Sequence, residues 1–139
     1  MKRIGKYIVL MIAFGTLYCL IELIYRQHTH WAMFVVGGLC GVACGLINEI
    51  IPWETPLWIQ GVLGAGIITL VEFVSGCVFN IWLGWNIWDY SALPFNALGQ
   101  VCLPFVLIWF VIAHIAIILD DYLRYWFFNE EKPHYTMWF

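Results

Sequence analysis

Three of the four apolar segments of this sequence contain one carboxylate each, where an ionised side chain is costly: Glu22, Glu72, and Glu49, which lies close to the predicted inner boundary. Glu22 and Glu72 each fall within an apolar run of about 20 residues. Even on the lenient insertion scale, a charge at the centre of a membrane costs about 2.5–3.5 kcal/mol. Two carboxylates that share a site of low dielectric do not both ionise readily. A shared proton or a bound cation is therefore the chemistry that these residues predict.

Small and polar residues fall on one face of each apolar run when the runs are drawn as helices. On the third run this face holds Gly61, Ala65, Thr69, Glu72, Gly76 and Asn80. The corresponding residues are Gly37, Gly38, Gly41, Gly45, Asn48 and Glu49 on the second, Gly15, Cys19 and Glu22 on the first, and the heptad-spaced Gln100, Leu107, His114 and Asp121 on the fourth. We expect the four faces to meet, with close helix packing at Gly37, Gly41, Gly45 and Gly76.

The elements that must position these faces are transmembrane helices. The chain is 63% hydrophobic and only 11% charged, whereas soluble domains average about 25% charged residues. Apolar runs cover residues 7–25, 31–51, 57–80 and 97–119, and about 20 residues suffice to cross the hydrocarbon core. We therefore expect one domain, an all-α integral membrane protein with a four-helix transmembrane bundle that lies in the lipid bilayer.

Two segments outside the spans carry many aromatic residues. Residues 81–96 are too polar to cross, and we expect an aromatic-rich interfacial loop or short helix between the third and fourth spans, with rings at headgroup level. After the fourth span, residues 120–139 form a C-terminal interfacial extension. Asp120 and Arg124 are spaced i,i+4, so we expect the helix to continue to Phe128 and to leave only the final residues irregular.

The placement of lysine and arginine predicts the orientation. Four spans with both termini in the cytoplasm put five of the six basic residues inside the cell and Arg26 outside, which agrees with the positive-inside rule. The first 19 residues also resemble a signal peptide, but no small-x-small cleavage site follows them. We therefore expect a multi-pass protein of the cell (inner) membrane that retains its first helix.

Depth in the membrane divides the polar residues into two groups. Those in or just above the outer half form a predicted polar pocket, an acidic vestibule under a tryptophan-rich lid: Glu22, Glu72, Asn80, Asp89, Asn96 and Gln100. Those towards the inner side form a predicted inner polar ring of Glu49, His114 and Asp120 or Asp121, with Arg124 beyond. A buried carboxylate needs hydrogen-bond donors. We expect Asn80 and Gln100 to donate to Glu72, and Glu22 to share its proton or cation.

Several other chemistries find little support. The five cysteines contain no C-x-x-C, and Cys40 and Cys44, one turn apart, are better explained by helix packing than by a metal. His28 and His30 form only a lone H-x-H, so we expect no metal site and no cofactor. A net charge of −3 without a basic block argues against nucleic acid as a partner. No phosphate-binding loop motif G-x-x-x-x-G-K-[ST] occurs, so any ATPase would be a separate subunit.

Longer segments of the chain resemble a known family. The stretches "LINEIIPWETPLW", "IITLVEFVSGCVFNIWLGWNIWDYS", "PFNALGQVCLPF" and "LDDYLRYWFFNEEKPHY" are similar to the putative ABC-transporter type IV family of small bacterial membrane proteins. The most specific positions are Glu72, Gly76, Asn80, Trp88, Asp89, Tyr90, Ser91, Asn96, Gly99 and Gln100. The resemblance implies that these residues act as a unit in a transport protein.

Three functions follow as hypotheses. The leading one is a transporter or channel-like subunit, a permease of two or more copies, whose acidic pocket binds a cation, a proton or a cationic solute. The second is an intramembrane enzyme that acts on a lipid, with Glu72 and Asp89 as acid and base. The third is a non-catalytic partner of other membrane proteins. Enzyme motifs such as G-x-S-x-G and H-E-x-x-H are absent from the sequence, and the buried carboxylates favour transport.

Overall fold

The protein is a bundle of four long apolar helical segments. The computed structural model describes residues 2–137, which form α1 (Lys2–Arg26), α2 (Trp31–Gly45), α3 (Ile47–Ile50), α4 (Leu57–Gly76), the π-helix η1 (Cys77–Trp82), β1 (Asn96–Ala97), β2 (Val101–Cys102) and α5 (Leu103–Phe128). Four segments are long and apolar enough to cross a membrane: Lys2–Arg26, Trp31–Ile50, Leu57–Trp82 and Leu103–Phe128. The predicted all-α fold with four transmembrane helices is confirmed.

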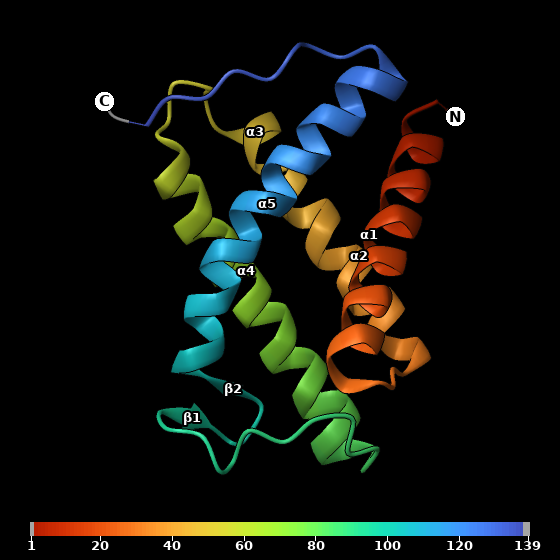
Figure 1. Cartoon of the computed structure of the whole chain (residues 1–139), viewed down its shortest axis with the longest axis vertical. Coiled ribbons are helices and arrows are strands. Elements are labelled where there is room, and N and C mark those ends of the chain that lie inside the picture. Colours follow the sequence, from red (N-terminus) through yellow and green to blue (C-terminus); the bar gives the residue numbers. More distant parts are fainter. Residues whose placement is uncertain (1, 138–139) are drawn as a thin grey trace.

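The helices form two antiparallel hairpins, α1–α2 and α4–α5 (Figure 1). Helix α2 packs against α1, α4 and α5, whereas α1 packs almost entirely on α2 and only lightly on α5. The N-terminus, α3 and the C-terminal tail lie at one end of the bundle, and β1 and β2 lie at the opposite end (Figure 1). Helix α2 therefore joins the two hairpins.

Glycines allow α1 and α2 to approach closely. A Cβ atom built on Gly37 would lie 2.5 Å from the Cβ of Tyr18, and one built on Gly41 would overlap the ring of Phe14. Lipid supplies no hydrophobic drive between helices, so such contacts contribute through van der Waals packing. Larger side chains at these two positions would push the helices apart.

The fourth helix begins later than residue 97, where we expected it. Asn96 pairs with Cys102 and Ala97 with Val101 in a short antiparallel hairpin. Leu98 and Gly99 turn the chain with φ of 55° and 71°, values that a right-handed helix does not contain. Helix α5 starts only at Leu103, after this turn.

Helix α5 continues to Phe128 and ends at Asn129, whose φ of 54° is a left-handed C-cap. The chain then crosses back over the end of the bundle that holds both termini (Figure 1). The backbone N–H of Leu57 donates to the carbonyl of Thr136 at 2.7 Å, and the ring of His134 stacks on Trp53 with centroids 4.9 Å apart. The tail is thereby attached to the turn that precedes α4.

Candidate functional site

Glu72 lies on α4 inside the bundle, and both of its carboxylate oxygens accept hydrogen bonds. The residue is only 7% exposed. The hydroxyl of Tyr90 donates to Oε1 at 2.8 Å, and the indole N–H of Trp109 donates to Oε2 at 2.8 Å. Burying a carboxylate without such donors would cost several kcal/mol, so this pair of bonds explains how Glu72 is accommodated.

The two donors come from different parts of the chain. Tyr90 belongs to the loop after η1, where its ring stacks on Phe105 with centroids 4.6 Å apart and an interplanar angle of 13°. Burial, and then the neighbouring Glu72, raise the pKa of Tyr90 above its usual range, so its hydroxyl stays protonated and donates. Trp109 is buried on α5. Glu72 thus joins α4, α5 and the loop between them.

A cleft of about 140 Å³ lies next to Glu72 and is lined by residues of all four spans. Among the described residues that line it, Glu72 is the only charged one. Leu17 and Ile21 of α1 and Ile115 of α5 also line the cleft, yet their side chains are exposed on the outside of the bundle. Because α1 and α5 barely touch, the cleft opens sideways between them.

Asn80 and Gln100 do not donate to Glu72 as we expected. The Asn80 amide donates to Oε1 of Gln100 at 2.8 Å, and Oδ1 of Asn80 accepts the backbone N–H of Ile87 at 2.7 Å. The Gln100 side chain packs over Gly76, where a Cβ would lie 2.6 Å from Oε1. These two side chains satisfy each other and fasten the loop to η1, so Glu72 takes its donors elsewhere.

Asp89 and Asn96 lie on the exposed loop and are not among the described residues that line the cleft. Oδ1 of Asp89 accepts the backbone N–H of Ser91 at 2.9 Å, and this bond lowers the pKa of Asp89 below its ordinary value. The Asn96 amide donates to the carbonyl of Leu93 at 2.9 Å, and its Oδ1 accepts from Gly99 at 3.1 Å. Both side chains shape the loop.

Glu22 is buried on α1 but is not among the described residues that line the cleft. Its Oε2 has no hydrogen-bond partner within residues 2–137. The structure therefore brings Glu72 to the cleft without Glu22.

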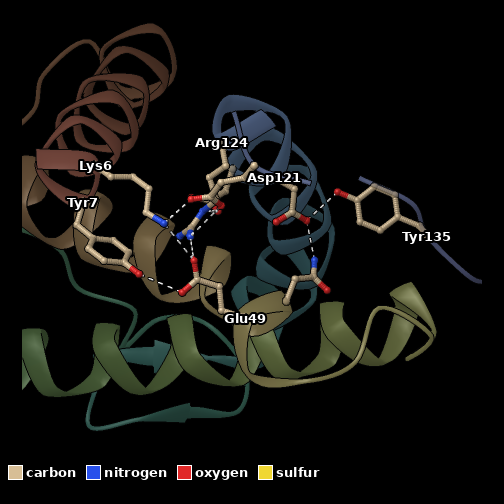
Figure 2. Close-up of polar contacts among 9 residues, drawn as sticks. Lys6, Tyr7, Glu49, Asp121, Arg124 and Tyr135 are labelled. Carbon is tan, nitrogen blue, oxygen red and sulfur yellow. Dashed lines mark hydrogen bonds and ion pairs between the residues drawn. The ribbon is translucent and has the colours of Figure 1, made fainter. Parts of the chain in front are cut away.

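A second polar group lies at the end of the bundle that holds the termini (Figure 2). Arg124 is 3% exposed, and its Nε donates to Oδ2 of Asp120 at 2.5 Å. Its Nη1 also pairs with Glu49. Lys6 bridges Glu49 at 3.3 Å and Glu130 at 2.5 Å. These five residues, the inner network, connect α1, α3, α5 and the tail.

Further hydrogen bonds extend the inner network (Figure 2). Tyr7 donates to Oε2 of Glu49 at 3.0 Å. Oδ2 of Asp121 accepts from Asn48 at 2.6 Å and from Tyr135 at 2.8 Å. Gly45 of α2 faces the Asp120 carboxylate so closely that a Cβ there would overlap it. A glycine at this position leaves room for the buried acid.

His114 lies apart from the inner network to which we assigned it. Its Nδ1 is 2.7 Å from the carbonyl of Phe110, and its ring packs on α4 where Gly61 leaves space. Glu49, Asp120 and Asp121 do gather around Arg124 and Asn48.

Several residues of both sites escaped the analysis of the sequence: Lys6, Tyr7, Trp109, Glu130 and Tyr135. Tyr90 was among the positions that carry the family resemblance, but its hydrogen bond to Glu72 was not expected. Trp109 had a usable signal, since it lies on the same helical stripe as Ala113, Ile117 and Asp120. Glu130 and Tyr135 follow the helix and have no periodicity that marks them.

Within residues 2–137, no three His, Cys, Asp or Glu side chains are grouped so that they could hold a metal ion. The five cysteines are free thiols.

Comparisons with known proteins gave one result for the whole chain. Neither the curated proteins nor the solved structures contain a match. A family model with the description "Putative ABC-transporter type IV" matches residues 7–138, which is nearly the full length. With its four apolar helices, the chain belongs to this family of ABC-transporter-related membrane proteins.

Proposed function

We propose that this protein is a transport subunit that binds an organic cation in the cleft beside Glu72. The observation that carries the proposal is a single carboxylate on an otherwise uncharged wall. A ligand that suits this cleft has an apolar body and one positively charged group. Glu72 would pair with that group, and the apolar side chains of the four spans would surround the body.

An organic cation fits the lining better than a metal ion does. Hard metal cations require about six or more oxygen ligands, or several carboxylates. The cleft offers the Glu72 carboxylate and the phenol of Tyr18 as its oxygen side chains. A carboxylate has about four acceptor sites, so Glu72 can keep Tyr90 and Trp109 and still accept from an ammonium group. The volume of about 140 Å³ is close to that of cavities that hold benzene.

The sideways opening of the cleft suggests the route by which a ligand enters it. Leu17, Ile21 and Ile115 lie where the cleft meets the outside of the bundle, which in a membrane is the acyl-chain region. A lipophilic amine concentrates in the bilayer, so it would enter between α1 and α5 from there. Larger ligands would extend into the lipid through the same opening.

Location and partners are part of the proposal. We place the protein in the cell membrane with both termini in the cytoplasm, because Lys2, Arg3, Lys6, Arg124 and Lys132 belong to the end that holds the termini and Arg26 to the other. The loop of residues 83–95 would then lie at the outer surface. A separate ATPase subunit would supply energy, and pairing with a second copy stays a prediction.

The alternatives have weaker support. A lipid-modifying enzyme that uses Glu72 and Asp89 as an acid–base pair would need both carboxylates at one reaction centre. Asp89 instead lies on an exposed loop and caps the amide of Ser91. A partner protein that offers its glycine faces to other chains would need those faces free, but Gly37 and Gly41 are covered by α1.

The test is ligand binding to the purified chain in lipid nanodiscs. Benzylamine carries the charge and the apolar body, and benzyl alcohol is its uncharged counterpart. We expect benzylamine to bind more tightly, and Glu72→Gln to weaken it by roughly 10- to 150-fold, since a hydrogen bond to a charged group contributes about 1.5–3 kcal/mol. Glu54→Gln, which removes an exposed carboxylate from the turn before α4, should leave binding unchanged.

Equal binding of amine and alcohol, or equal loss in the two variants, would contradict the proposal. Uptake of the amine into vesicles that contain the protein, abolished by Glu72→Gln, would extend it from binding to transport.

A further inference from the structure

We propose that a groove between α1 and α5, at the end of the bundle that holds the termini, binds an anionic phospholipid. The groove encloses about 740 Å³ and is separate from the cleft at Glu72. Lys2, Arg3 and Lys6 line it from α1, Phe128 lines it from α5, and Glu130 from the tail. The proposal does not depend on the organic-cation site.

The charges of the groove leave an excess of positive groups. Lys6 is paired with Glu49 and Glu130. Lys2 and Arg3 make no ion pair with any carboxylate in the described part of the chain, residues 2–137, and both are exposed. A phosphate that enters the groove therefore meets two cations whose charge is not already neutralised.

The depth of these residues matches that of a headgroup. Lys6 and Arg26 are separated along α1 by roughly 30 Å at 1.5 Å per residue, which equals the thickness of the hydrocarbon core. Lys2 and Arg3 precede Lys6 and so lie in the layer of lipid phosphates. Trp126 and Phe127, which precede the groove residue Phe128 on α5, are exposed, as is usual for aromatic residues at the interface.

The groove has an apolar part as well as a basic one, and this favours a phospholipid over a soluble phosphate. Val9 lines it on the side of the hydrocarbon, and Phe128 adds an aromatic ring at the end of α5. An acyl chain can follow Val9 along α1, whose neighbouring Ile8 and Ile12 are exposed. Basic pockets between transmembrane helices bind lipid headgroups in this way.

The binding test uses native mass spectrometry of the full chain in detergent, titrated with phosphatidylglycerol or with phosphatidylcholine. We expect phosphatidylglycerol to bind more tightly than phosphatidylcholine. The double variant Lys2→Gln/Arg3→Gln should weaken the binding of phosphatidylglycerol by about 30-fold, because each basic residue near an anionic headgroup strengthens binding by roughly fivefold. Two single substitutions that each remove one positive charge give a matched comparison. Arg3→Gln should weaken binding. Lys132→Gln should not, because Lys132 is exposed and lies outside the groove lining.

A second variant tests the groove itself. Gly5 lines the groove, and a Cβ built there meets no atom within 4 Å. Gly5→Leu therefore narrows the groove, keeps every charge and removes a helix-weakening glycine. We expect it to fold normally and to bind phosphatidylglycerol more weakly.

Three results would overturn the proposal. Equal weakening by Arg3→Gln and Lys132→Gln would show that binding reflects overall charge. Unchanged binding to Gly5→Leu would show that the lipid does not lie in the groove. Displacement of the lipid by an equal concentration of glycerol 1-phosphate would show that a soluble phosphate suffices.

Discussion

Arg124 stabilises the inner network, and its removal should lower the stability of the whole bundle. The side chain is 3% exposed, and its partner Asp120 is 0% exposed. In Arg124→Gln, Glu49 keeps its contacts with Lys6 and Tyr7, but Asp120 loses its only ion-pair partner in the described part of the chain. Removing one partner of a buried pair costs about 3–5 kcal/mol. We expect a value near 3 kcal/mol, because only one of the two carboxylates is left without a cation.

The assay is thermal unfolding in detergent micelles at one fixed scan rate, followed by near-ultraviolet circular dichroism. A loss of about 3 kcal/mol corresponds to a decrease in Tm of roughly 10 °C for a chain of this size. The double variant Asp120→Asn/Arg124→Gln removes both charges, so it should recover a large part of that loss. Lys132→Gln, on the exposed tail, is the control for a changed net charge.

Two outcomes would refute this reasoning. The first is a Tm for Arg124→Gln within about 2 °C of that of the unmodified protein, a shift that corresponds to well under 1 kcal/mol. The second is a double variant as unstable as the sum of the two single variants, because additivity would mean that Asp120 and Arg124 do not act as a pair.

Two further predictions concern the tail and the orientation. Burial, and then Asp121, raise the pKa of Tyr135 above its ordinary value, so the docking of the tail should be fully stable below about pH 10, the pKa of a free tyrosine, and should weaken above that pH. The fluorescence anisotropy of a fluorophore at the C-terminus should therefore fall above about pH 10. In Tyr135→Phe the anisotropy should be lower at every pH and should not change with pH. Asn86 is exposed on the loop after η1, at the end of the bundle opposite the termini. In a variant whose native cysteines are replaced by alanine, Asn86→Cys should react with an impermeant maleimide added outside intact cells. Labelling only from the cytoplasm would reverse the proposed orientation.

The sequence by itself determined the class of the protein, its four helical segments and the existence of buried polar faces. Each of these depends on neighbours within a few turns. Apolar length decides whether a helix crosses a membrane, and the helical period places Glu72 and Gly76 on one face. The continuation of α5 to Phe128, with Arg124 bonded to Asp120, follows from the same i,i+4 spacing.

Predictions that depended on which side of a helix faces the interior of the bundle were less successful. The heptad line through Leu107 was wrong, because Leu107 is 62% exposed while Trp109, Ala113 and Ile117 are buried. The line was also extended to Gln100, which precedes the helix and lies beyond the hairpin turn. A helix face is fixed only when its neighbours bury one side of it.

Only the tertiary structure decided which groups meet. Glu72 takes its donors from Tyr90, 18 residues away, and Trp109, 37 residues away, while the nearer Asn80 bonds Gln100. Lys6 and Glu130 are 124 residues apart and form an ion pair because the tail folds back over the bundle. A hydrogen bond requires its two atoms to lie within about 3 Å of each other, and local periodicity fixes the direction of a side chain without fixing which distant residue the fold brings to it.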